Sequence, residues 1–211
     1  MVIAEKGKNI LPASYNADLG FSWKPLPNVL INASLWYLFL EQEFVYVGDE
    51  AVVEPSGKTA RKGVDVGLRY QLNNWLFWNT DFTYTHARAL EEAKGSDYIP
   101  LAPKTTFVSG LSVKNLNRFS GSINARYLGD RPANEDNSVT AKGYFITDFS
   151  VNYQFRKVSV GINIDNIFNT KWKETQFLTE SRLQNETESV EEIHYTAGTP
   201  FNARLILKYN F

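Results

Sequence analysis

Apolar and polar side chains alternate along segments of ten residues or more, and this feature constrains the fold more than any other. Within residues 144–155, Phe149, Val151 and Tyr153 fall on one parity and Ser150 falls on the other. Successive side chains of a β-strand point to opposite faces, so each such segment has one apolar and one polar face. The pattern predicts amphipathic strands, and no segment carries the 3.6-residue apolar stripe of a surface helix.

The alternation recurs along the whole chain and predicts nine strands. We expect them over residues 14–24, 29–41, 61–71, 75–88, 104–114, 118–129, 143–155, 157–168 and 200–211. Eleven residues at a rise of ~3.3 Å span ~36 Å and, tilted by ~45°, cross ~25 Å, which is the height of the apolar band of an outer-membrane barrel. Strands of soluble proteins average about 5–6 residues. The strand lengths therefore favour a membrane barrel.

The connections between these strands alternate between short and long. Short turns are expected at 25–28, 72–74, 115–117 and 156–157. Long loops are expected at 42–60, 89–103, 130–142 and 169–199. Short turns on one side and long loops on the other are typical of bacterial outer-membrane barrels.

Charged residues on the polar faces argue against a dry protein core. They are Asp65, Arg69, Arg126, Asp148, Asp165, Arg204 and Lys208. Burying unpaired charges is costly, whereas a watery or plugged lumen accommodates them. The plainer interpretation of Arg69, Arg126 and Arg204 is salt bridges with Asp65, Asp148 and Asp165 across neighbouring strands or with a plug; contact with an anionic ligand is the alternative. The predicted fold is all-β, a transmembrane antiparallel up-and-down β-barrel; a soluble β-sandwich binding module is the alternative.

Composition excludes several classes of function. The chain has no cysteine, and its 22 basic residues are balanced by 23 acidic ones, so a basic nucleic-acid-binding face is not expected. His86 and His194 lie in distant segments, and each is interpreted as a surface histidine rather than a metal ligand. Nothing positions Glu191 and Glu192 for hydrolysis. We therefore expect no catalytic residue, no metal and no cofactor, and we do not expect an enzyme.

Three stretches, two of them near the end of the chain, resemble TonB-dependent outer-membrane receptors. Residues 165–172, DNIFNTKW, are similar to the motif that closes the penultimate strand of that family, with Trp172 in place of tyrosine. Residues 98–104, YIPLAPK, are similar to the family's lead into a strand. The last strand is amphipathic and ends on Phe211.

The resemblance implies that the chain is part of a larger barrel. Barrels of that family have 22 strands and are plugged, whereas this chain supplies about nine. Open sheet edges in lipid would leave backbone groups unsatisfied. We expect residues 1–211 to be the carboxyl-terminal portion of a receptor barrel, with the plug domain and TonB box absent and Met1 an internal start. Residues 1–8 have no apolar signal-peptide region, so any export signal is expected upstream.

The resemblance also implies a function. The complete receptor is expected in the outer membrane of a Gram-negative bacterium, taking up a scarce ligand, above all a ferric siderophore or another iron or haem complex. Its expected partners are outer-membrane lipid, the TonB complex acting through the plug, the barrel-assembly machinery and a small-molecule ligand such as a ferric chelate. A passive porin- or adhesin-type barrel is the alternative.

Candidate binding residues lie in the loop 169–199. They are Trp172, Phe177, Arg182 and Tyr195, because aromatic and charged side chains at a barrel mouth can hold an aromatic chelate or a sugar. The plainer interpretation of each is a residue of a solvated, mobile loop. Phe211, Tyr209 and Leu207 share one face of the last strand and resemble the signal that the barrel-assembly machinery reads.

Overall fold

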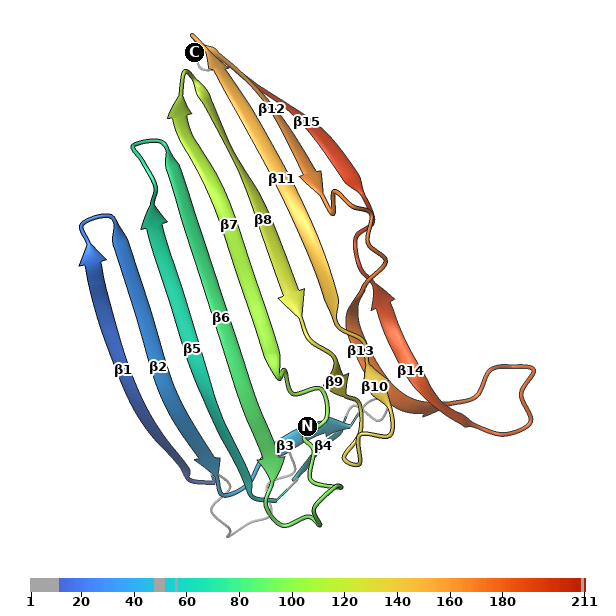
Figure 1. The fold of residues 1–211 in the computed structure, drawn as a ribbon. Coiled ribbons are helices and arrows are strands. Elements are labelled where there is room, and N and C mark those ends of the chain that lie inside the picture. The colour runs from blue at the N-terminus through green and yellow to red at the C-terminus, as the bar shows by residue number, and fades with distance from the viewer. Residues whose placement is uncertain (1–11, 48–51, 56, 210) are drawn as a thin grey trace.

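The computed structural model describes residues 12–47, 52–55, 57–209 and 211, and nine long strands in these residues form one antiparallel sheet (Figure 1). The strand order is β1-β2-β5-β6-β7-β8-β11-β12-β15, a meander in which each long strand pairs with the next one. The bounds are β1 Ser14–Leu26, β2 Val29–Leu40, β5 Thr59–Gln71, β6 Leu76–Ala89, β7 Thr105–Leu116, β8 Phe119–Leu128, β11 Tyr144–Phe155, β12 Val158–Asp165 and β15 Asn202–Tyr209. The predicted fold class and all nine strands are confirmed, as part of a barrel that this chain does not close.

Short turns and long loops lie at opposite ends of the sheet, as the sequence predicts (Figure 1). We call these the turn end, at the top of Figure 1, and the loop end, at the bottom. Three of the four long loops differ from expectation because they contain short strands of their own. These are β3 Phe44–Val47 with β4 Val52–Pro55, β9 Arg131–Pro132 with β10 Thr140–Ala141, and β13 Lys173–Ser181 with β14 Val190–Ala197.

Asparagine and arginine residues make the tight turns possible. The Asn73 side-chain oxygen accepts hydrogen bonds from the backbone N–H groups of Trp75, at 3.0 Å, and Leu76, at 2.9 Å. Arg156, in the predicted two-residue turn, takes a φ of 51°, and Asn115 takes 56°. Asparagine tolerates this left-handed region better than most residues do, which explains its use at strand ends.

The pairing register makes the apolar residues of all nine strands one continuous face. One cross-strand path runs from β1 to β11 through Phe21, Ala33, Val66, Phe82, Phe107, Tyr127 and Phe145. A second path runs from β7 to β15 through Leu111, Ile123, Phe149, Ile164 and Ala203. We call this surface the apolar face and the opposite one the polar face.

No second layer of the described chain covers the apolar face. Leu19, Leu205 and Leu207 are 73%, 75% and 74% exposed. Val160 and Ile162 of β12 are also exposed, so this row does not pack inside a water-soluble core. The buried apolar residues instead lie mostly in and beside the loops, and they are Ala87, Ala89, Ile99, Ala133, Ala141 and Ile146.

The edge strands β1 and β15 each pair with one neighbour within the described residues. The described part of the chain contains no helix that is long and apolar enough to cross a membrane. The predictions made for residues 1–8 lie outside the residues that the structure describes.

Candidate functional site

Ion pairs bridge neighbouring strands on the polar face. Arg126 pairs with Asp148 at 3.4 Å, and Arg204 pairs with Asp165 at 2.9 Å, as predicted. Arg69 pairs with Asp81 instead, through bonds of 2.7 and 2.9 Å to its two carboxylate oxygens. Gly67 lies opposite Asp81 and has no side chain, so the space between the two strands is open to the Arg69 guanidinium.

Asp65 was an expected partner of Arg69, but it bonds a different residue. Its carboxylate accepts a 2.6 Å hydrogen bond from the hydroxyl of Thr83, which lies directly opposite it on β6. Its charge is therefore met by a neutral donor. Hydroxyl and ion-pair partners together give the polar face fixed, partly exposed charges rather than a dry core.

Asn166 ends β12 three residues before the predicted end. Its φ is 50°, and it is only 2% exposed. Its side-chain amide donates to the carbonyls of Thr170 and Thr199, at 2.8 and 3.0 Å, and its side-chain oxygen accepts from the Thr170 N–H at 2.8 Å. Its own backbone N–H donates to Asp148 at 2.9 Å. One residue therefore joins three segments where the strand becomes the loop.

Trp172 lies at the base of the β13–β14 hairpin, not at its tip. Its indole N–H donates to the carbonyl of Thr199 at 3.0 Å, and its ring centre is 4.7 Å from that of Tyr144. A Cβ at Gly198 would overlap the indole, so only glycine leaves room for the ring there. These contacts give Trp172 a positioning role at the point where the hairpin leaves the sheet.

The other three candidate residues lie on the hairpin but do not converge. Phe177 pairs with His194, and Tyr195 pairs with Gln176. Because adjacent residues of a strand point to opposite sides, Phe177 and Tyr195 lie on opposite faces of the hairpin. The Lys173 ammonium lies 4.0 Å from the centre of the Tyr195 ring. Arg182 follows the end of β13 and is exposed.

A glutamine that the sequence does not single out attaches the hairpin to the sheet. Gln176 is 3% exposed, and its side-chain amide bonds both backbone groups of Lys142, accepting from the N–H at 3.1 Å and donating to the carbonyl at 2.8 Å. The loop 169–199 is thus partly ordered as a β-hairpin. No local pattern marks Gln176, because its partner lies 34 residues away in sequence.

The two histidines are far apart in sequence and have different surroundings. His194 Nε2 lies 2.9 Å from the Ser181 hydroxyl and 3.6 Å from a Glu192 oxygen. His86 lies on β6 opposite Lys62 of β5. Among the described residues, no group of three or more His, Asp or Glu side chains is arranged to hold a metal ion.

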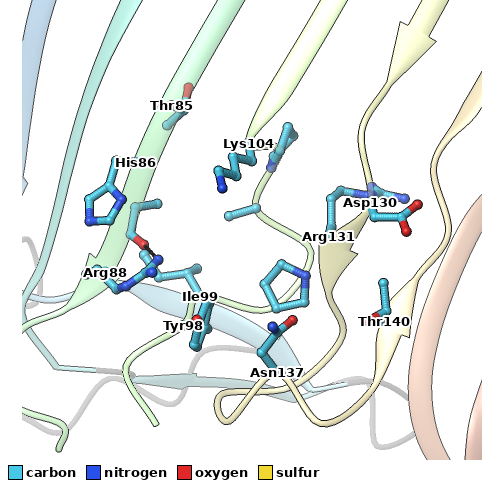
Figure 2. Close-up of a pocket in the computed structure, with 14 residues that line it drawn as sticks. Thr85, His86, Arg88, Tyr98, Ile99, Lys104, Asp130, Arg131, Asn137 and Thr140 are labelled. Atoms are coloured by element: carbon cyan, nitrogen blue, oxygen red, sulfur yellow. Dashed lines mark hydrogen bonds between the residues drawn. The ribbon is translucent and has the colours of Figure 1, made fainter. Parts of the chain in front are cut away.

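Two cavities adjoin at the loop end and share His86 and Arg88. The first, of about 340 Å³, lies between the end of β6, the residues before β7 and the β9–β10 hairpin (Figure 2). In Figure 2, Arg88 lies beside Tyr98 on the β6 side of this cavity, and Arg131 lies on the β9 side of it. The second, of about 390 Å³, is lined by Tyr37, Lys62 and Lys94 together with the shared pair.

Asp130 and Arg131 follow β8 and differ in how their charges are met. The Asp130 carboxylate accepts from the Gly143 N–H at 2.7 Å and from the Lys142 ammonium at 3.0 Å. These two hydrogen bonds hold the pKa of Asp130 below its ordinary value. Arg131 has two buried nitrogens, Nε and one terminal Nη, without a hydrogen-bond partner, and burial lowers its pKa.

Comparison with known proteins identifies similar chains. A family model described as "TonB dependent receptor-like, beta-barrel" matches residues 12–167. A comparison with the curated protein sequences finds no significant match.

Solved structures share the fold at low sequence identity. The ferric-catecholate import receptor Fiu of E. coli K12 aligns over 100% of this chain and 30% of its own, with a TM-score of 0.72 and 18% identity. The ferric yersiniabactin uptake receptor FyuA of Yersinia pestis aligns over 94% and 30%, with 0.68 and 14%. The copper transporter OprC aligns over 94% and 32%, with 0.67 and 14%. The chain thus spans about a third of each of these structures.

Proposed function

The chain belongs to the TonB-dependent receptor β-barrel family, and on that premise we propose that the complete protein is an outer-membrane receptor for TonB-energised uptake of a ferric chelate. Members of this family are transport receptors, not enzymes. The proposed location is the outer membrane of a Gram-negative bacterium. The proposed partners are outer-membrane lipid, the TonB complex acting through a plug, and the barrel-assembly machinery.

The observation that carries this proposal is the continuous apolar face. It crosses all nine strands, is largely exposed, and lies opposite a face that carries three Arg–Asp pairs. A sheet of this kind is stable when lipid covers one side and a wet or plugged lumen faces the other. Within the described residues β1 and β15 each have one unpaired edge, which supports a place for residues 1–211 in the carboxyl-terminal part of the barrel wall, with further strands and a plug supplied outside this chain.

The proposed ligand follows from the names of the similar structures and from the loop end. Fiu and FyuA are described as receptors for ferric complexes, whereas OprC is described as a copper transporter. We assign ligand contact to Phe177, Arg182 and Tyr195 of the β13–β14 hairpin, which do not form one pocket, because Phe177 and Tyr195 lie on opposite faces. Trp172 contributes by holding the hairpin base through its bond to Thr199.

The assembly signal is proposed at the end of β15. Tyr209 and Leu207 are on the apolar face, opposite Val158 and Val160 of β12. The rings of Tyr209 and Phe211 meet edge to face, with centres 5.1 Å apart. An exposed edge strand that ends in aromatic rings is suited to recognition by strand pairing.

Uptake of radiolabelled iron tests the proposal. Cells that lack the receptor are complemented with the complete gene, in backgrounds with and without TonB, and supplied with ferric chelates of the catecholate and carboxylate classes. We expect TonB-dependent accumulation of at least one class, reduced in the F177A/R182A/Y195A variant but not in a control variant at the turn end, K114A. Accumulation that is independent of TonB would favour a passive porin-type barrel instead.

A further inference from the structure

Basic side chains gather on the apolar face at the loop end. Val64 and Tyr84 form a cross-strand pair on this face, and the next pair toward the loops on the same face is Lys62 with His86. Arg88 follows His86 by two residues and therefore lies on the same face. The change from apolar to basic is thus abrupt, and it occurs one pair beyond the Tyr84 ring.

Lys104 adds a third permanent cation to this group. Its ammonium lies 5.9 Å from the centre of the Tyr84 ring, and it lines the first cavity together with His86 and Arg88. We define Lys62, Arg88 and Lys104, with His86 between them, as the basic shelf. Two adjoining cavities hollow the surface around the shelf. Figure 2 shows His86, Arg88 and Lys104 around the first of them.

Acidic groups near the shelf neutralise only part of its charge. Asp97 pairs with Arg88 at 3.2 Å, and the Arg88 guanidinium lies 4.1 Å from the centre of the Tyr98 ring. Glu92 lines the second cavity, where Lys94 balances it. Lys62 and Lys104 form no ion pair with the described residues.

The first cavity also carries a basic and an acidic residue on its β9 side, Arg131 and Asp130. The two buried nitrogens of Arg131 that have no partner belong to a residue that lines it. Asp130, which lines it too, is already bonded to Lys142 and Gly143. Asp130 is thus bonded elsewhere, and the Arg131 guanidinium adds positive charge on the β9 side of the cavity.

We propose that the basic shelf binds the phosphorylated head group of a lipid in the membrane leaflet at the loop end. The inference rests on the proposed function, because it requires the apolar face to be in lipid. The loop end of such a barrel faces the outside of the cell, so the lipid belongs to the outer leaflet. Basic residues at the membrane surface attract anionic head groups, and tyrosine rings such as Tyr37 and Tyr84 sit at head-group level.

A lipid fits the shelf better than free phosphate does. The apolar face begins directly below the shelf, at Val64 and Tyr84, and continues toward the turn end through Val66 and Phe82. Acyl chains anchored by a phosphate on the shelf would lie along this surface. Free phosphate would use the same cations but would gain nothing from the apolar residues beneath them.

Native mass spectrometry of the complete receptor in detergent tests the proposal. The probes are diphosphoryl lipid A, monophosphoryl lipid A and inorganic phosphate. The variant K62Q/R88Q/K104Q removes three charges, and the control K24Q/K114Q/K157Q removes three at the turn end. We expect the affinity of the shelf variant for diphosphoryl lipid A to fall by about tenfold or more, with little change in the control, since each basic residue contributes to attraction of an anionic lipid.

A second variant measures the contribution of the two lysines without breaking the Arg88–Asp97 ion pair. K62Q/K104Q leaves that pair in place, and we expect an intermediate loss of lipid affinity and the heat-modifiable gel mobility of a folded barrel. Equal lipid affinity in the wild type and the triple variant would overturn the proposal, as would an equal loss in the control. Displacement of the lipid by millimolar inorganic phosphate would show a free-anion site and overturn it too.

The uptake assay separates this inference from the proposed function. If the receptor binds diphosphoryl lipid A through the shelf but accumulates no iron, the lipid site is supported and the proposed ferric ligand is wrong. If the receptor accumulates iron through TonB but binds lipid A equally with and without the shelf charges, the proposed function is supported and the lipid site is wrong.

Discussion

At the residue scale, Asn166 combines a backbone and a side-chain role. The left-handed φ of 50° turns the chain out of β12, and the buried amide then bonds Thr170 and Thr199 across the loop. Alanine at this position would have to adopt the same left-handed φ, and it would leave the carbonyls of Thr170 and Thr199 without the amide that bonds them. These two roles explain why residue 166, the first asparagine of the DNIFNTKW stretch, is an asparagine.

Substitution of Asn166 separates the two roles. We expect Asn166→Ala to destabilise the folded receptor by about 2–4 kcal/mol, because it adds backbone strain to the loss of buried hydrogen bonds. Asn166→Gly keeps the φ preference and loses only the side-chain bonds, so its cost is expected to be smaller. Guanidinium unfolding in detergent, followed by tryptophan fluorescence, measures both. Equal stability of the alanine variant and the wild type would contradict this account.

The sequence predicted some of these residue contacts and missed others. Parity placed Arg126 with Asp148 and Arg204 with Asp165 on the polar face, and both pairs are present. Arg69 pairs with Asp81 of β6 because Asp65 lies four residues away on the same strand, ~13 Å along it at ~3.3 Å per residue. Predictions from parity therefore identify the face of a charge but not its partner.

Asp130 gives the loop after β8 a dependence on pH. Its pKa is lowered in the folded state by the Gly143 N–H and the Lys142 ammonium. A carboxylate with a lowered pKa contributes stability above its unfolded pKa, about 3.9, and this contribution is lost as pH falls through the folded value. The contribution is small, because the Asp130 side chain is 54% exposed.

Hydrogen exchange at the Gly143 amide measures this effect. After correction for the intrinsic rate, protection of that amide is expected to fall as the pH drops through the lowered pKa of the Asp130 carboxylate. Asp130→Asn removes the titrating group, so the corrected protection should be lower at neutral pH and independent of pH in this range. The same acid-induced loss in the asparagine variant would show that another group is responsible.

At the element scale, the β13–β14 hairpin depends on few contacts with the sheet. Its strands carry many Glu and Thr residues, so no apolar face marks them as strands in the sequence. The long strands were predictable because one whole face of each is apolar. The hairpin was not, because Gln176 and Trp172 attach it through bonds to residues far away in the chain.

Removal of the Gln176 amide is expected to loosen the hairpin without unfolding the sheet. In Gln176→Ala, backbone groups of Lys142 lose both partners, so we expect faster hydrogen exchange over 173–197 and unchanged exchange in β11 and β12. Phe177→Ala is the matched control, since the neighbouring ring is exposed and bonds nothing in the sheet. Equal exchange in the two variants would show that Gln176 does not hold the hairpin.

At the scale of the whole molecule, a single-layer sheet must obtain its stability from its surroundings. The apolar face has no protein partner within the described chain, and the polar face has only its own ion pairs and hydrogen bonds. Lipid on one side and the rest of the barrel at both edges would supply what is missing. The two faces are therefore expected to tolerate charge very differently.

A matched pair of substitutions on β8 tests this difference. Ile123 lies between Leu111 and Phe149 on the apolar face, and Asn124 lies opposite Asp148 on the polar face. We expect Ile123→Arg to cost about 2–4 kcal/mol in the lipid and to reduce the folded receptor in outer-membrane fractions. Asn124→Arg places its charge near Asp148 and is expected to be tolerated. Heat-modifiable gel mobility reports the folded fraction of each.

The most direct test of the account is the environment of alternate residues along β12. These 211 residues contain no cysteine. Single cysteines are introduced at Val160, Ile162, Ser159 and Asn163 of the complete receptor, with any cysteine outside these residues replaced by serine, and are labelled with a nitroxide in lipid bilayers. We expect labels at Val160 and Ile162 to collide preferentially with oxygen, which concentrates in lipid. Labels at Ser159 and Asn163 should collide preferentially with a water-soluble nickel complex. The same preference at all four positions, or the reverse of this alternation, would contradict the claim that the apolar face lies in the membrane.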